Sequence, residues 1–283
     1  MNRIILKSNW GIIKPTFCGD DRLSNVAYLL RDTVIEYVRF NTHFSETVPD
    51  FDFPIGWGEL QNQGVVYHSF FHALANKRKN GDCVFAEYPF ELNKYKYKEQ
   101  PEGHRLDFWV LLGAKRGKNE KATVLLVEYK HRWAFVRKSY LYEDWRGKKD
   151  KPLLAQGSLA TVWRQDNEKL SEKATAYRSV RSSFLPFEPS RCKLVTMTLM
   201  TVLVCQDSLD PGELKGVHES DFESQLEKTV QRLDSDMQPD WRAYWWLPET
   251  RQKEEAPWYD EDKRKHHFYY RGAYFLARLK SVQ

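Results

Sequence analysis

The sequence predicts a mixed α/β fold, and three observations support this prediction. Segments with helical periodicity alternate with short β-rich segments along the 283 residues. Two of the β-rich segments, 105–112 and 122–131, are apolar on both faces. A third, 193–205, has the β-branched composition of a buried strand. Because a sheet with two apolar faces has to be covered on both, we expect a three-layer α/β/α sandwich with a central mixed sheet.

Two helices are predicted in the first third of the chain. Ser24 can cap a helix over 24–41, in which apolar residues recur at helical spacing. A second helix is expected over 59–75, ending before the turn signal at 80–82. Residues 45–57 contain two prolines and a glycine and are predicted to form a loop.

The remaining elements follow from similar patterns. We predict strands at 83–92, 105–112, 122–131, 193–205, 241–247 and 267–279, and helices at 153–163, 168–180 and 220–233. The polar, glycine-bearing tract 113–121 is expected to be a hairpin loop. The charged, proline-bearing tract 248–265 is predicted to be loop as well.

Composition favours one folded domain with a solvated surface. The chain is 41% hydrophobic and 29% charged, and its mean hydropathy is −0.68. We expect a single domain over 1–283, with an N-terminal helical extension at about 1–57, a core at about 58–206 and a C-terminal elaboration at about 207–283.

Several classes of protein are disfavoured. The longest apolar run, 194–205, is too short to span a bilayer, and no secretion signal is visible. The four cysteines form no CxxC pair, which argues against structural zinc and a disulfide framework. A cytoplasmic protein without a membrane partner is therefore expected.

Three ionisable residues fall at the ends of the two central strands. If Asp107 lies opposite Glu128 in an antiparallel hairpin, Phe108 pairs with Val127 and the two acids meet at one edge of the sheet. Glu128 and Lys130 then project from the same face, because side chains alternate along a strand. An Asp–Glu pair needs a cation to cancel its repulsion, and oxygen ligands suit Mg²⁺ or Mn²⁺.

The motif resembles a known signature. Leu106-Asp107, followed after twenty residues by Glu128-Tyr129-Lys130, is similar to the motif of the PD-(D/E)XK, or restriction-endonuclease-like, nucleases. Leu106 replaces the nominal proline of that family, and the resemblance covers about 58–206 by the order of predicted elements. It implies a restriction-endonuclease-like fold and an Mg²⁺-dependent deoxyribonuclease that hydrolyses phosphodiester bonds, acting as a homodimer where both strands are cut.

The resemblance also implies roles for single residues. Asp107 and Glu128 become metal ligands, and Lys130 becomes the catalytic lysine that positions water and steadies the phosphate. The Val127 carbonyl is a further candidate ligand. Glu59 fits the glutamate that many members place on the preceding helix, although the helix dipole also favours a glutamate there. Weaker matches are Glu87, for the same role as Glu59, and Gln156, for a polar residue of recombination-type members.

Cationic and aromatic side chains are interleaved over 131–151. Cations suit phosphate contacts and aromatic rings suit base stacking, whereas a solvated loop with aromatic anchors has the same composition. The position beside the acidic motif favours nucleic acid as the partner, with DNA expected. The candidate contacts are Arg132, Arg137, Lys138, Lys148 and Lys149.

Other interpretations remain open. One is a catalytically silent nucleic-acid-binding or assembly subunit on a nuclease-like scaffold, and another is a partner-dependent subunit of a defence or transposition system. Retention of both acids and the lysine favours the enzyme over the silent scaffold. His68 and His72 have a spacing that can bind zinc, but without an HExxH motif we expect ordinary helix polarity.

Overall fold

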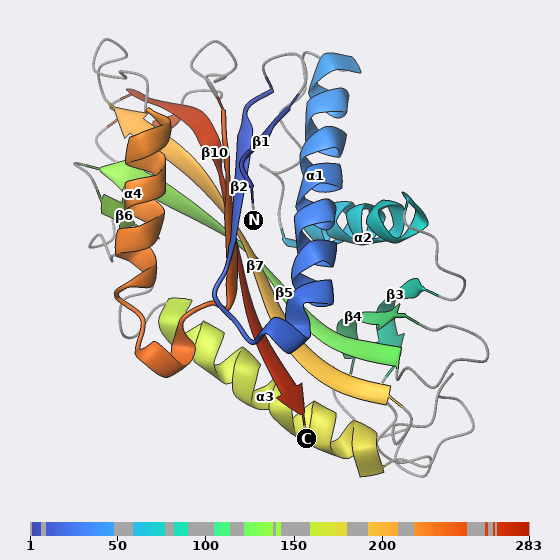
Figure 1. The fold of residues 1–283 in the computed structure, drawn as a ribbon. Helices are drawn as coiled ribbons and strands as arrows, with labels where there is room; N and C mark the ends of the chain where they lie inside the picture. Colours follow the sequence, from blue (N-terminus) through green and yellow to red (C-terminus); the bar gives the residue numbers. More distant parts are fainter. Residues whose placement is uncertain are drawn as a thin grey trace.

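The computed structural model describes residues 2–6, 10–47, 59–76, 82–89, 105–113, 122–137, 140–142, 159–179, 192–208, 218–247, 258–259, 263 and 265–282. These residues form α-helices and one large mixed sheet, so the predicted mixed α/β class is confirmed (Figure 1). No helix in this part of the chain is long and apolar enough to cross a membrane.

The helices and strands have the following bounds. The helices are α1 (Ser24–Thr47), α2 (Glu59–Asn76), α3 (Leu159–Ser179) and α4 (Glu219–Val230), with short 3₁₀ turns at Asp21–Leu23 and Ser235–Met237. The strands are β1 (Ile4–Ile5), β2 (Ile12–Phe17), β3 (Cys83–Pro89), β4 (Arg105–Leu112), β5 (Ala122–Arg137), β6 (Tyr140–Tyr142), β7 (Cys192–Ser208), β8 (Trp241–Trp246), β9 (Trp258–Tyr259) and β10 (Lys265–Val282).

The sheet places β5 beside both β4 and β7. Eight strands follow the order β1-β2-β8-β10-β7-β5-β4-β3, and β6 and β9 are attached to β5 and β10. Strands β5 and β7 pair in parallel, whereas β4 and β5 are antiparallel. A parallel pair needs a crossover connection, and α3 lies on it. The predicted hairpin register is confirmed, because Phe108 pairs with Val127 and Leu112 with Thr123.

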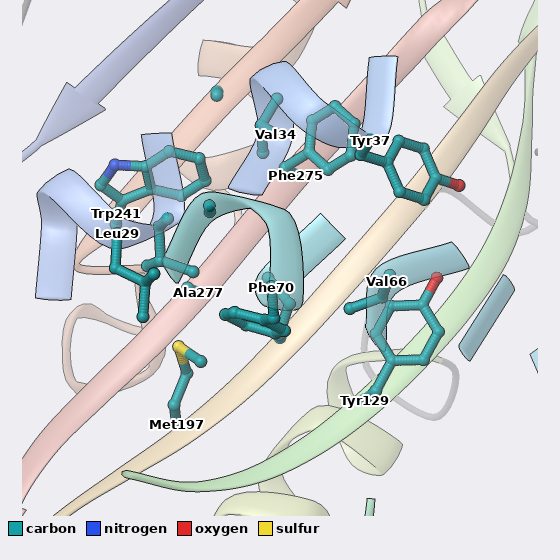
Figure 2. Packing of buried hydrophobic residues seen from close by; sticks show 14 of the residues in the cluster. Leu29, Val34, Tyr37, Val66, Phe70, Tyr129, Met197, Trp241, Phe275 and Ala277 are labelled. Atoms are coloured by element: carbon teal, nitrogen blue, oxygen red, sulfur yellow. The ribbon is translucent and has the colours of Figure 1, made fainter. Parts of the chain in front are cut away.

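The two faces of the sheet bury separate cores, as the alternation along β5 predicts. Leu125, Val127 and Tyr129 belong to the core that α1 and α2 cover. Val124 and Leu126 belong to the core on the opposite face, where α3 packs. Figure 2 shows the first core, in which side chains of α1 and α2 meet those of β5, β7, β8 and β10.

The opposite face continues from α3 to α4. Trp163 of α3 shares a buried cluster with Phe222 and Leu226 of α4. In Figure 1 these two helices lie on the other side of the sheet from α1 and α2. The long strands β7 and β10 run beneath both helices, so one sheet connects the α3 region to the α4 region.

Several predicted boundaries were wrong. The helices predicted at 153–163 and 168–180 are one helix over its described part, α3, because the polar stretch between them keeps a buried stripe of Trp163, Leu170 and Ala174. Helix α1 continues to Thr47, where a loop was predicted to begin at 45.

The strand predictions also needed correction. Strand β5 continues to Arg137 because its end pairs with both β6 and β7. Strands β1 and β2 were not predicted, and β9 lies inside a tract predicted as loop. Residues 48–57, 80–81, 90–92 and 153–158, on which other predicted boundaries fall, are outside the described residues.

Candidate functional site

Asp107 stands at the start of β4 and is held from two sides. The backbone N–H of Tyr129 on β5 donates to its Oδ2 at 2.6 Å. The Nε2 of Gln63 on α2 donates to its Oδ1 at 3.2 Å. The carboxylate therefore has a fixed orientation that depends on the β4–β5 hairpin and on the first two turns of α2.

Glu128 lies next to Asp107 on the same face of the hairpin. Its carboxylate pairs with the ammonium of Lys173 on α3, and the two side chains are 14% and 15% exposed. The register of β4 and β5 places Glu128 one residue beyond the last paired positions, Phe108 and Val127. Helix α3 therefore contacts the hairpin at the point where the pairing of β4 with β5 ends.

Glu59, in the first turn of α2, forms ion pairs with two cationic side chains of β5. Its Oε1 lies 3.4 Å from the Nζ of Lys130, and its Oε2 lies 3.0 Å from Nη1 of Arg132. The backbone N–H of His131 donates to the same Oε2 at 3.2 Å. Glu59 therefore fixes the β5 segment that carries the predicted catalytic lysine.

Asp166 on α3 is a fourth acid of the site. One of its carboxylate oxygens is buried and accepts no hydrogen bond among the described residues. Burial raises the pKa of Asp166, and the nearby charges of Lys130 and Lys169 oppose that shift. The negative charge of Asp166, like that of Glu59, favours the protonated form of Lys130 and so acts to raise its pKa. Lys130 is therefore close to acids of two different helices, Glu59 of α2 and Asp166 of α3.

The electrostatics of the site are dominated by burial. Burial raises the pKa of Asp107, and the hydrogen bond from the Tyr129 N–H and the charge of Lys130 only partly compensate. Burial likewise raises the pKa of Glu128 to about 7, against the opposing charge of Lys173. Burial alone would lower the pKa of Lys130, but the carboxylates around it, first Glu59, raise it instead. The lysine is therefore cationic beside two acids that are costly to ionise.

The donor set suits a hard divalent cation with an incomplete protein shell. The described residues contain no group of three or more His, Cys, Asp or Glu side chains arranged to hold a metal ion. Asp107 and Glu128 supply two carboxylates, and the repulsion between them raises the pKa of Glu128. Mg²⁺ keeps several waters and is commonly held by one or two carboxylates, so this pair fits it.

The structure brings four of the predicted site residues together. Asp107, Glu128, Lys130 and Glu59 come from β4, β5 and α2 and meet at one end of the hairpin. Val127 is paired with Phe108 and Met197 within the sheet, and a ligand role for its carbonyl stays a prediction.

Among the predicted nucleic-acid contacts, Arg132 lies at the site through its ion pair with Glu59. Arg137 is the last residue of β5, and Glu87 lies on β3. Four other predicted residues, Lys138, Lys148, Lys149 and Gln156, lie outside the described residues.

Gln63, Asp166 and Lys173 were not predicted from the sequence. A signal for the last two was present, because Asp166 and Lys173 fall on the same helical stripe as Trp163, Leu170 and Ala174. Charged residues on a stripe that otherwise packs against the sheet indicate a role beyond solvation. Gln63 gave no comparable signal, since an amide in a helix has many uses.

The histidine pair on α2 lies apart from these contacts. The rings of His68 and His72 are 4.2 Å apart, and that of His68 is 5.0 Å from the ring of Phe40 on α1. Burial, followed by the proximity of His72, lowers the pKa of His68. The pair therefore packs against an aromatic ring of α1.

Comparisons with protein-family models, with curated proteins and with solved structures gave no match. The chemistry of the site therefore rests on its own geometry.

Proposed function

We propose that the protein is a divalent-metal-dependent nuclease of the PD-(D/E)XK type that hydrolyses phosphodiester bonds, with DNA as the substrate. The observation that carries this proposal is the meeting of Asp107 and Glu128, two acids with raised pKa values, beside the cationic Lys130. Buried acids that repel each other favour a bound cation, and a fixed ammonium beside them suits a phosphate group.

The proposal includes the fold. A three-layer α/β/α sandwich of the restriction-endonuclease-like type is supported by the order α2-β3-β4-β5-α3-β7. It is also supported by the burial of different cores on the two faces of the sheet, one under α1 and α2 and the other under α3 and α4. The parallel pairing of β5 with β7 after the antiparallel hairpin gives the mixed sheet that was expected.

Each residue has a physical role in the proposed hydrolysis. Bound Mg²⁺ or Mn²⁺ would lower the pKa of a water molecule and neutralise charge on the phosphate. Asp107 and Glu128 would hold the ion, and Gln63 would keep the Asp107 carboxylate oriented. Lys130 would orient the attacking water and stabilise the negative charge that develops on the phosphate.

Glu59 and Arg132 have supporting roles in this proposal. Glu59 would keep Lys130 in place through its ion pair, and it would serve as a metal ligand only after releasing that contact. Arg132, which is partly exposed beside Glu59, would contact the nucleic-acid backbone.

A second candidate function has an observation in its favour. The pairs Glu128–Lys173 and Glu59–Lys130 balance charge within the protein itself. A site in which lysines already balance part of the acidic charge would suit a nucleic-acid-binding or assembly subunit without catalysis. We prefer the nuclease because the chain has both acids and the lysine of the motif, and all three lie at the same place on the hairpin.

The test is cleavage of plasmid, linear duplex and single-stranded DNA, and of an RNA oligonucleotide, with Mg²⁺ or Mn²⁺. The wild type and Asp107→Asn are compared, with Asp221→Asn on the exposed surface of α4 as a matched control. We expect metal-dependent cleavage by the wild type and the control, and none by Asp107→Asn. DNA binding without cleavage would favour the second candidate, and absence of both would contradict both functions.

A further inference from the structure

The sheet-facing stripe of α3 contains charged residues where apolar ones would be expected. Trp163, Leu170 and Ala174 on this stripe are at most 1% exposed. Asp166 and Lys173 lie among them, three residues after Trp163 and three after Leu170. Burying a charge is unfavourable unless it is paired, so these positions need a physical reason.

Lys173 lies beside both proposed metal ligands. Its ammonium forms an ion pair with Glu128, and both side chains are largely buried. Its charge also lowers the pKa of Asp107, so it acts on both acids at once. A single positive charge supplied by the protein therefore already offsets part of the negative charge of the two acids that the proposed function assigns to a divalent ion.

The pair does not need to be retained for stability. A buried ion pair contributes little net stability compared with apolar residues of similar size, because desolvation of two charges offsets their attraction. Lysine also carries its charge on a flexible four-carbon stem that can withdraw without unfolding the helix. A divalent ion carries twice the charge and can be shared by both carboxylates, so exchange of one cation for the other is physically reasonable.

We infer that Lys173 is a positioning residue that holds Glu128 in the metal-free protein and is displaced when a divalent cation binds between Asp107 and Glu128. This inference rests on the proposed function. In this inference α3 regulates metal binding. Lys173 occupies Glu128 until the ion binds, and the affinity for the metal ion is lower than it would be without the lysine.

Lys169 provides a matched control. It lies on the same helix, one turn before Lys173, carries the same charge and is exposed. Because it lies near Asp166, it contributes charge to the region without the ion pair to Glu128. A difference between variants of the two lysines therefore reports the ion pair and not the net charge of α3.

The first measurement is Mn²⁺ affinity, determined from the electron paramagnetic resonance signal of the free ion. It is made at about pH 8, where ordinary carboxylates are ionised. Lys173→Gln is expected to bind Mn²⁺ roughly tenfold more tightly than the wild type, since one competing positive charge is gone. Lys169→Gln is expected to change the affinity by about twofold or less, because exposed charges are screened. Lys173→Arg, which keeps the pair, is expected to restore weak binding.

The second measurement needs no variant. Acetylation of each lysine by a chemical reagent is followed by mass spectrometry with and without Mn²⁺. We expect Mn²⁺ to increase the labelling of Lys173 several-fold, because the displaced amine reaches solvent, and to leave the labelling of Lys169 unchanged.

The outcomes separate this inference from the proposed function. If Lys173→Gln and the wild type bind Mn²⁺ equally and Asp107→Asn does not bind it, the role of Lys173 is overturned and the metal site stands. Unchanged labelling of Lys173 on Mn²⁺ binding would overturn it in the same way. Absence of Mn²⁺ binding by the wild type and by Lys173→Gln would overturn both proposals together.

Discussion

Two regions on the same face of the sheet use ion pairs in different ways. On α4, the side chains of Glu219, Glu223 and Glu227 are 22%, 37% and 38% exposed, and they pair with Arg3, with Lys14 of β2 and with Arg242 of β8. Under α3, Glu128 and Lys173 are 14% and 15% exposed. The α4 carboxylates line the rim of an apolar cluster, whereas the α3 charges lie within the packed stripe of the helix.

The difference in burial separates ion pairs to which we assign no function from the pair at the proposed site. Exposed ion pairs contribute little stability and cost little to keep. Buried charges are costly, and they persist where a ligand or a reaction requires them. The exposed Lys14–Glu223 pair is therefore expected to tolerate substitution, whereas substitution of Glu128 is expected to impair the proposed cleavage.

The largest expected effect is on cleavage. Glu128→Gln keeps the size of the side chain but removes a proposed ligand, and we expect the cleavage rate to fall by about a hundredfold to a thousandfold, as when other strong electrostatic contacts to a transition state are removed. Glu223→Gln on α4 is expected to keep wild-type cleavage. Rates are measured on the best DNA substrate with saturating Mg²⁺. An equal loss in both variants would erase the distinction between the two regions.

A large effect on stability is expected where α3 meets the α4 cluster. Trp163 is 1% exposed, and its indole N–H donates to the Met237 carbonyl oxygen at 3.0 Å. Trp163→Ala is expected to lower the free energy of unfolding by about 3–5 kcal/mol, through the cavity it creates. Chemical denaturation measures this loss. Glu168→Ala, at an exposed position of α3, is expected to have little effect, and a similar loss in that variant would contradict the assigned anchor.

A moderate effect is expected from pH. Because the pKa of Glu128 is about 7, protons compete with the metal ion below that value. Mn²⁺ affinity is expected to fall roughly tenfold for each pH unit below about 7 and to level off above it. Titrations of the wild type across this range measure the dependence, and a profile that stays flat down to the ordinary carboxylate range would contradict the raised pKa.

The raised pKa of Glu128 also makes the stability of the folded protein depend on pH. In the metal-free protein, folded Glu128 keeps a proton between its ordinary pKa of 4.5 and about 7, whereas the unfolded chain has lost it. The folded state therefore binds more protons, and this group makes the protein less stable as the pH rises through that window.

The smallest effect is expected at the α4 rim. Lys14 and Glu223 form an ion pair in which both side chains are more than a third exposed. Lys14→Gln is expected to change the free energy of unfolding by at most about 1 kcal/mol. A loss as large as that of Trp163→Ala would show that the rim pairs are structural anchors, and the comparison between the regions would fail.

Local patterns in the sequence predicted the hairpin but not the elements that depend on distant pairing. The β4–β5 register followed from alternation and from a short polar loop, both of which are local. Strand β2 pairs with β8, far along the chain, and its own six residues carry little signal. Helix α3 was predicted as two helices because its middle is polar, and only packing against the sheet shows that the stripe is continuous.

The site divides in the same way. Asp107, Glu128 and Lys130 could be placed together because they lie on one hairpin, and Glu59 could be proposed because it begins the helix that precedes the strands. Gln63, Asp166 and Lys173 could not be placed, since the positions of α2 and α3 over the strand ends depend on the whole sheet.

The most direct test of the proposed nuclease is the Lys130→Ala variant, because Lys130 is positioned by Glu59 and is not a proposed metal ligand. Mn²⁺ binding and DNA cleavage are measured on the same preparation, with folding checked by circular dichroism. We expect Mn²⁺ affinity within a few-fold of the wild type and cleavage lower by about a hundredfold to a thousandfold, because the variant keeps the ion but loses the stabilising charge. Cleavage at the wild-type rate by this variant would contradict the assignment.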